Sequence, residues 1–207
     1  MKQLLVLGGG GHARVVLDAA RSSGRIVAGV FDDRPGRTGQ TIDGFAIVGD
    51  YAGFLGKLHT GIEAFVAVGA NDVRLRLASE APAQWATLVH ASAYVAPSAV
   101  LGVGTVVMAG AVVQPGAVVG DHVVVNTCSS VDHDCVVADG VHIAPGARLC
   151  GGVHVGDGAL VGAGSVVLPN IRVGAWAVVG AGAMVRDDIP PAETWVGMPA
   201  KRRQVST

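Results

Sequence analysis

The chain has 207 residues and a formal net charge of −1, with 15 basic and 16 acidic residues interspersed along it. This balance predicts no broad basic surface, so we expect no binding of nucleic acid. The segment from Met1 to Leu7 lacks the charged, apolar and cleavage regions of a signal peptide, so we expect a cytoplasmic protein.

The first 88 residues alternate short apolar runs with amphipathic stretches. We expect strands at 2–7, 26–31, 46–48 and 63–68, and helices at 12–22 and from Asn71–Asp72 onward. The first helix is expected to bury Val15, Val16, Ala19 and Ala20 and to end at Gly24. This order of elements predicts an α/β domain of the Rossmann-like βαβ type over residues 1–88.

A glycine run, Gly8 to Gly11, lies between the first strand and the first helix. Backbone N–H groups at such a helix start attract phosphate, and Asp32 after the second strand suits hydrogen bonds to a ribose or a base. A tight turn without a ligand would show the same glycines. Since only one mononucleotide-binding half fits before residue 89, one nucleotide is a better expectation than NAD.

A strict six-residue period occupies the second part of the chain. Every sixth residue from Val89 to Val185 is aliphatic, 17 positions in all. This period matches neither a helix nor a flat strand, but it is typical of a chain coiled into a three-sided prism. Residues 91–120 contain no Asp, Glu, Lys or Arg, yet their glycines and unbroken period favour a β-solenoid over a membrane span. We expect no membrane insertion.

The neighbouring columns support this register. Small residues stand two places before most aliphatic positions, and Gly recurs three places after them, where a corner needs unusual backbone angles. Three six-residue units make a coil of 18 residues, so residues 18 apart are expected to be stacked neighbours. We expect this all-β domain to span residues 89–207, with a short C-terminal tail.

The clearest polar interruption of the repeat is the run from Asn126 to Asp134. His133 falls at a corner and is expected to point outward, between the carboxylates of Asp132 and Asp134. A carboxylate beside an imidazole orients it and raises its pKa, which suits a general base. An exposed corner histidine without a function would give the same pattern.

Gly151 is expected one coil above His133, because the two are 18 residues apart. Its backbone N–H is then available to a ligand held beside the imidazole. A base and an amide donor in this arrangement fit acyl transfer, in which a tetrahedral oxyanion forms while the nucleophile loses a proton.

Several motifs together resemble one family. They are the hexapeptide repeats, the run Gly8 to His12, the segments 68–71, 126–127 and 132–134, and the closing segment 196–201. They are similar to the sugar O- and N-acetyltransferases of the left-handed β-helix superfamily, in particular the sialic acid O-acetyltransferases and the nucleotide-linked amino-sugar N-acetyltransferases of the bacillosamine-pathway type.

The resemblance implies a left-handed parallel β-helix and a homotrimer that binds acetyl-CoA in the grooves between subunits. It implies that His133 is the general base, that Asp134 orients it where relatives often have Glu, with Asp132 able to share that role, and that the Gly151 amide faces the thioester. The substrate contacts that it implies are Gly8, Gly10, Gly11, His12, Asp32, Asp33, Asn71, Asn126 and His142. The CoA contacts are His142, Gly151 and Lys201, although a solvated basic tail would explain Lys201 equally well.

We therefore expect an acetyl-CoA-dependent transferase that acetylates the amino group of a nucleotide-linked sugar of the 4-amino-4,6-dideoxy type, for bacterial surface glycan synthesis. The acetyl group is expected to pass directly to the sugar, without a covalent enzyme intermediate. The alternative is O-acetylation of sialic acid or a related free sugar. The sequence does not distinguish UDP, GDP and dTDP.

Two other classes of protein fit the sequence less well. A solenoid metallo-hydratase of the γ-carbonic anhydrase type would need histidines in H-x-x-x-x-H spacing, which this chain lacks, so no metal is expected. A non-catalytic solenoid would show a repeated Thr or aromatic ladder, and none is present. Cys128, Cys135 and Cys150 have no CxxC spacing, so we expect them to pack rather than to form a disulfide or a zinc site.

Overall fold

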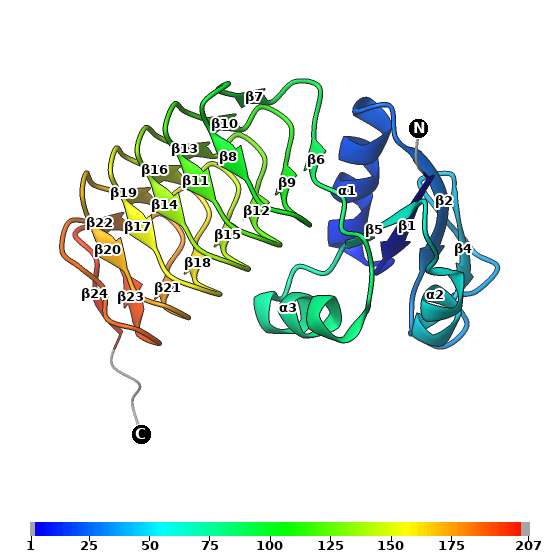
Figure 1. Ribbon diagram of the computed structural model, residues 1–207. Helices are drawn as coiled ribbons and strands as arrows, with labels where there is room; N and C mark the ends of the chain where they lie inside the picture. The colour runs from blue at the N-terminus through cyan, green and yellow to red at the C-terminus, as the bar shows by residue number, and fades with distance from the viewer. Residues whose placement is uncertain (1–2, 204–207) are drawn as a thin grey trace.

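The computed structural model describes residues 3–203. They form an α/β domain and, beside it, an elongated solenoid of stacked short strands, called the coil below (Figure 1). In the first domain a five-stranded sheet has the order β3-β4-β2-β1-β5, parallel except for the β3–β4 pair. Its elements are β1 (Gln3–Leu7), α1 (Gly11–Ser22), β2 (Ile26–Phe31), β3 (Thr41–Ile42), β4 (Phe45–Gly49), α2 (Tyr51–Lys57), β5 (Ile62–Val66) and α3 (Asn71–Glu80). The expected Rossmann-like βαβ arrangement is confirmed.

The sequence did not predict β3 and α2. The helix α2 is only seven residues long and contains Gly53 and Gly56, which weaken any helical pattern. Its start is fixed by Asp50, whose side chain accepts a hydrogen bond from the Gly53 N–H at 2.9 Å. Of the expected first strand, Lys2 lies outside the described residues.

The buried face of α1 differs from the expected one at Val15. The helix buries Val16, Ala19 and Ala20 as predicted, but the Val15 side chain is exposed. The buried stripe is centred on Ala13, Val16, Leu17 and Ala20, at the i, i+3, i+4, i+7 spacing of one helix face. Val15 lies beside this stripe, so its assignment to the inner face was wrong.

The second domain is a left-handed parallel β-helix of short strands in three sheets. The first sheet contains β6 (Leu88–Val89), β9 (Val106–Val107), β12 (Val124–Val125), β15 (His142–Ile143), β18 (Leu160–Val161), β21 (Val178–Val179), β23 (Thr194–Val196) and β24 (Lys201–Arg202). The second contains β7 (Tyr94–Val95), β10 (Val112–Val113), β13 (Ser130–Val131), β16 (Arg148–Leu149), β19 (Val166–Val167) and β22 (Met184–Val185). The third contains β8 (Val100–Leu101), β11 (Val118–Val119), β14 (Val136–Val137), β17 (His154–Val155) and β20 (Arg172–Val173).

The register of the coil is the one that the period of six predicts. Val113 pairs with Val131 and Val131 with Leu149, so residues 18 apart are stacked. The aliphatic column and the small residues two places before it form one continuous core. The corner glycines have positive φ, as expected, at residues 104, 110, 116, 140, 146, 152, 158, 164 and 182. Asp134 occupies such a corner with a φ of 58°, which is uncommon for a residue other than glycine.

One face of the coil is covered by the α/β domain. Leu88, Val106 and Val124 point outward from the first sheet and are fully buried in a cluster with the apolar stripe of α1. The next outward residue in this column is His142, which pairs with Val124 in the ladder. His142 therefore stands at the end of the apolar part of this contact. The expected boundary between residues 88 and 89 falls inside β6 and stays a prediction.

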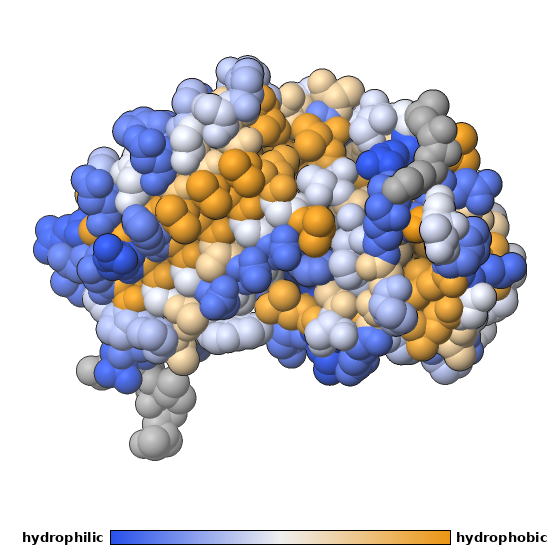
Figure 2. Space-filling view, in the orientation of Figure 1, coloured by the Kyte–Doolittle hydropathy of each residue, from blue (hydrophilic) through white to orange (hydrophobic). Residues whose placement is uncertain are grey.

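A second face of the coil carries an uncovered apolar stripe (Figure 2). Val100, Val118 and Val136 point outward from β8, β11 and β14, and these three side chains are 40–56% exposed. Apolar patches of this continuity on a monomer mark interaction surfaces.

None of the helices within residues 3–203 has both the length and the apolar character of a membrane span.

Candidate active site

A histidine and a carboxylate form a pair at one vertex of the prism. His133 follows β13, its side chain is 63% exposed, and its Nδ1 lies 2.9 Å from Oδ2 of Asp134. The hydrogen bond to Asp134 raises the pKa of His133, with a further contribution from the charge of Asp132. With Nδ1 donating to Asp134, Nε2 is the atom that is free to accept a proton.

Asp132 has a different function in this turn. Its Oδ1 accepts a hydrogen bond from the backbone N–H of His133 at 2.7 Å, which fixes the turn rather than the ring. Asp134 is therefore the carboxylate that orients the imidazole. The left-handed backbone of Asp134 belongs to the repeat, because Cys128 and Asn170 have the same positive φ at equivalent corners.

Gly151 lies directly above His133, as the 18-residue coil predicts. The Gly152 N–H donates to the His133 carbonyl at 2.9 Å, which holds the two coils together. At another vertex, the amides of Val103 and Asp121 each donate to an Asp side chain 18 residues further on. Pro169 is the corresponding residue above Gly151 and has no acceptor side chain. Among the described residues the Gly151 N–H has no hydrogen-bond acceptor, so it is free to bind an oxyanion.

A second group of polar side chains lies on the face that the α/β domain covers. Nδ2 of Asn126 lies 2.9 Å from Nε2 of His142. The backbone N–H of Thr127 donates to Oδ1 of Asn126 at 2.8 Å, so the Asn126 amide must present its NH₂ group to the imidazole. His142 Nε2 is therefore an acceptor, which requires a neutral ring protonated at Nδ1.

His12 belongs to this second group. It lies in the first turn of α1, with its ring centroid 6.2 Å from that of His142, and its Nε2 is buried without a hydrogen-bond partner among the described residues. Burial lowers the pKa of His12 to about 4, with smaller contributions from the charges of His142 and Arg74. Burial and the charge of Arg74 lower the pKa of His142 to about 4 as well.

The glycine loop forms the wall of a cleft of about 390 Å³ on the α/β domain. Gly8 has a φ of 109°, and a Cβ atom there would lie 2.8 Å from the Ala67 carbonyl oxygen, so this position requires glycine. Gly10 and Gly11 have open space where a side chain would be. Their amides stand at the start of α1, so the loop can take a phosphate group.

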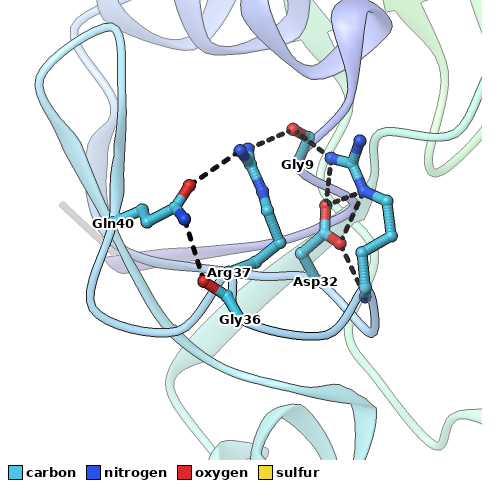
Figure 3. A network of polar contacts seen from close by, with 6 residues as sticks. Gly9, Asp32, Gly36, Arg37 and Gln40 are labelled. Atoms are coloured by element: carbon cyan, nitrogen blue, oxygen red, sulfur yellow. Dashed lines mark hydrogen bonds and ion pairs between the residues drawn. The ribbon is translucent and has the colours of Figure 1, made fainter.

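The two aspartates after β2 are held by neighbouring groups. Asp32 is buried and accepts hydrogen bonds from the backbone and guanidinium of Arg34, which lower its pKa (Figure 3). Arg34 and Arg37 both donate to the Gly9 carbonyl, at 2.8 and 2.9 Å. Asp33 lines the cleft, and its Oδ1 accepts from the Tyr51 N–H at 2.6 Å. Asp32 thus positions Arg34 beside the loop in the free protein.

Asn71 joins the two domains. Its Nδ2 donates to the carbonyls of Gly158 and Ala159, at 3.0 and 3.1 Å, and its Oδ1 accepts from Arg74. Residues of the coil and of α3 are thereby held together, whereas the cleft is lined by other residues. A contact between Asn71 and the substrate stays a prediction.

The predicted residues of the β-helix other than Lys201, together with His12, form two groups in a single chain. His133, Asp134 and Gly151 stand at the vertex between the second and third sheets. His12, Asn126 and His142 lie on or beside the first sheet, which is the side of a triangular prism opposite that vertex. Lys201 is exposed in β24, at the far end of the coil from the α/β domain (Figure 1).

Three arginines beside the glycine loop or at the domain junction were not predicted from the sequence. Arg34 and Arg37 follow β2 in a segment where only the aspartates were singled out. Arg74 is fully buried between the domains. The available signal was its position on the same helical face as Ala78, which is also buried in α3, because a charged residue on an inward face needs an explanation.

The three cysteines are free. Cys135 is buried as expected, and its Sγ lies 3.1 Å from the Cys150 carbonyl oxygen. Cys128 is exposed at a corner with a φ of 55°, so the expectation that it packs was wrong. Within residues 3–203 no group of three His, Cys, Asp or Glu side chains is arranged to hold a metal ion.

Two family comparisons agree with this architecture. Residues 3–81 match the PglD N-terminal domain, and residues 152–187 match the bacterial transferase hexapeptide family, which has six repeats. An uncharacterized protein, L142 of Acanthamoeba polyphaga mimivirus, is 31% identical over 96 residues, 46% of this chain. The chain spans only 19% of the length of that curated relative.

Solved structures cover almost the whole chain. The acetyltransferase domain of PglB from Neisseria gonorrhoeae FA1090, in complex with acetyl coenzyme A, is 38% identical, with a TM-score of 0.90 over 98% of this chain and 99% of that one. The chain belongs to the hexapeptide-repeat sugar acetyltransferases. PerB from Caulobacter crescentus, in complex with CoA and GDP-perosamine, is 36% identical, with a TM-score of 0.92 over 99% of this chain and 98% of that one. WeeI from Acinetobacter baumannii AYE is 26% identical, with a TM-score of 0.88 over 98% of this chain and 100% of that one.

Proposed function

We propose that this acetyltransferase moves the acetyl group of acetyl-CoA to the amino group of a nucleotide-linked amino sugar of the 4-amino-4,6-dideoxy type. The observation that carries the proposal is the His133–Asp134 pair beneath the free Gly151 N–H. The proposal is supported by the structures of two relatives, one solved with acetyl coenzyme A and one with CoA and GDP-perosamine.

The reaction needs no covalent enzyme intermediate. The sugar amine attacks the thioester carbonyl carbon, and the Gly151 N–H donates to the oxyanion that forms. Nε2 of His133 accepts the proton that the nitrogen loses, while Asp134 stabilises the resulting imidazolium. The C–S bond then breaks, and the proton on His133 passes to the departing thiolate. The products are the acetamido sugar and CoA.

The nucleotide is assigned to the glycine-loop cleft. The diphosphate lies over Gly10 and Gly11, where the chain leaves open space at the start of α1. Gly8 and Asp33 line the same cleft, and Arg34 stands beside its loop. His12 reaches from this cleft toward Asn126 and His142, so the sugar is expected to extend along these side chains.

The active site is completed by a second copy of the chain. His133 stands at the vertex opposite the face that carries His142, so one chain does not bring its base to its own nucleotide cleft. A ring of three copies, associated through the stripe of Val100, Val118 and Val136, would place a vertex of one copy against the next copy. Acetyl-CoA is then held in the groove between them, beside Gly151, His142 and Lys201. The cytoplasmic location and a role in surface glycan synthesis stay predictions.

Thiol release from acetyl-CoA tests the reaction, with UDP-, GDP- and dTDP-linked 4-amino sugars and free sialic acid as acceptors. The expected result is turnover with one nucleotide amino sugar and a loss of roughly 10²-fold or more in kcat for His133→Ala, at an unchanged melting temperature. The matched control is His59→Ala, because His59 is an exposed histidine outside both groups. Turnover with sialic acid alone would show that the protein is an O-acetyltransferase. Full activity of His133→Ala would show that His133 is not the general base.

Complementation tests the shared site. Chains carrying His133→Ala and chains carrying His142→Ala are unfolded together, refolded as a mixture and compared with each variant alone. Each mixed trimer contains one interface with both native histidines, so activity well above that of either variant is expected. Activity no greater than the sum of the two variants would place both histidines in a site within one chain.

A further inference from the structure

Arg74 is a fully buried cation without an anionic partner. Its Nε donates to the His122 carbonyl, and its terminal nitrogens donate to Val68, Gly69, Gly140 and the Asn71 side chain, at 2.8–3.2 Å. All five acceptors are neutral oxygens, and no carboxylate of the described residues forms an ion pair with Arg74. Burial lowers the pKa of Arg74 to about 10, so it remains charged at neutral pH.

Burying a charge without an opposite charge lowers the stability of the protein, and the packing of the two domains does not by itself need a charged side chain here. Buried charges are ordinarily paired with an opposite charge, and an apolar side chain of similar volume often stabilises an interface as well or better. The two sets of acceptors come from the end of β5 and α3 on one side and from corners of the coil on the other. The charge is therefore held at the junction of the two domains. Gly69 connects it to the histidines, because its carbonyl accepts a hydrogen bond from Arg74, His142 bonds its backbone, and a Cβ on Gly69 would lie 3.8 Å from the Cβ of His12.

The imidazole of His142 is already restricted by geometry. The Thr127 N–H orients the Asn126 amide, and that amide donates to Nε2 of His142. A proton added at Nε2 would face the NH₂ group of Asn126 and break this hydrogen bond. A fixed positive charge nearby opposes the same protonation.

We propose that Arg74 is a positioning residue for acetyl transfer, whose buried charge acts together with burial to keep His12, His142 and the substrate amine in their neutral forms. This inference rests on the proposed function for the amine, but its statement about the histidines is independent of any substrate. A neutral amine is the only nucleophilic form, because an ammonium group has no free electron pair. A neutral His12 can accept a hydrogen bond from that amine at Nε2, which has no partner among the described residues.

The charged groups around this site agree with this function. α1 contributes His12, β15 contributes His142 and α3 contributes Arg74. His122, whose carbonyl accepts from Arg74, precedes β12. Burial and the charge of Arg74 lower its pKa, and the charges of Asp121 and Asp139 oppose this. Neither the pKa of His12 nor that of His142 is shifted by a carboxylate, so Arg74 is the charged side chain that acts on both.

Histidine ring NMR tests the proposal on the intact protein. In wild type, His12 and His142 are expected to stay neutral at pH 6, with His142 protonated at Nδ1. In Arg74→Gln both titration midpoints should rise but stay below 6.5, because burial, the larger cause of both low pKa values, remains. Arg74→Lys, which keeps the charge, should stay near wild type. With a nucleotide amino sugar as acceptor, the acid limb of the pH profile of kcat should move to higher pH in Arg74→Gln only.

Three results would overturn the proposal. One is a wild-type midpoint of 6.5 or above for both histidines, which needs no variant. Another is unchanged midpoints in a folded Arg74→Gln protein, and the third is an Arg74→Lys protein that titrates like Arg74→Gln, which would show that the hydrogen bonds matter and the charge does not. Failure of the acetylation assay alone, with the histidine midpoints as expected, would count against the proposed function and not against the influence of Arg74 on the histidines.

Discussion

Gly151 lies so close to His133 that a Cβ atom on it would be 2.5 Å from both Cε1 and Nε2 of the imidazole. The φ of Gly151 is not positive, so the absence of a side chain is required by the close approach and not by the backbone. This contact brings a free backbone N–H and a general base side by side on neighbouring turns of the β-helix. One substrate carbonyl and one nucleophile can therefore use both groups.

Replacing Gly151 by Ala should separate these two groups. The methyl group must push the ring of His133 aside, and the exposed ring can move because it is held mainly by Asp134. We expect a loss of about 10- to 10²-fold in kcat with little change in melting temperature. Steady-state kinetics and thermal unfolding check this, with Gly56→Ala in α2 as the control, since Gly56 has open space around it. Equal activity of the two variants would refute the contact as a functional one.

The two carboxylates beside His133 should differ in their effect on the pH profile. A general base must be deprotonated, and Asp134 raises the pKa of His133, so it moves the acid limb of kcat/KM to higher pH. Asp134→Asn should therefore shift that limb to lower pH and lower kcat by roughly 10-fold, because the imidazolium loses its partner. Asp132→Asn should give a smaller shift, since Asp132 bonds the His133 backbone. A larger shift in Asp132→Asn than in Asp134→Asn would show that Asp132, and not Asp134, is the carboxylate that acts on the imidazole.

Filling the space over the glycine loop should weaken nucleotide binding without unfolding the protein. Gly11 begins α1, and no atom lies within 4 Å of the position that a Cβ would take there, so the side chain of Gly11→Leu can leave the backbone without a clash at Cβ. The side chain would occupy the expected place of the diphosphate. We expect KM for the nucleotide sugar to rise by about 10-fold or more, a change of roughly 1.4 kcal/mol, with KM for acetyl-CoA unchanged. Gly56→Leu is the matched control. Equal KM values for both variants would show that the diphosphate does not bind over Gly11.

A charge in the apolar stripe should dissociate the proposed trimer. Val118 is the middle residue of the stripe on β11, so Val118→Glu would bury a carboxylate between copies. Sedimentation velocity should show monomers, and activity should fall with the trimer because the site is shared. Val15→Glu is the control, since Val15 is similarly exposed but lies on α1. A Val118→Glu protein that sediments as wild type would exclude this stripe as the interface.

The sequence by itself determined the coil and its register. A period of six is sufficient, because one aliphatic residue per prism side fixes which side chains point inward and which residues stack. The position of Gly151 above His133 follows from that arithmetic alone. A carboxylate beside the imidazole of His133 was also expected, but the residues left both Asp132 and Asp134 as candidates, and the structure shows the ring hydrogen bond to Asp134.

Only the tertiary structure decided what lies at the junction of the two domains. Nothing in the local pattern shows that Arg74 binds carbonyls of the coil, because its partners His122 and Gly140 are 48 and 66 residues away. The same holds for Asn71, which bonds Gly158 and Ala159, and for the approach of His12 to His142. A repeat specifies contacts between its own coils, whereas the docking of a separate domain depends on surface shape and on burial, which a one-dimensional period does not encode.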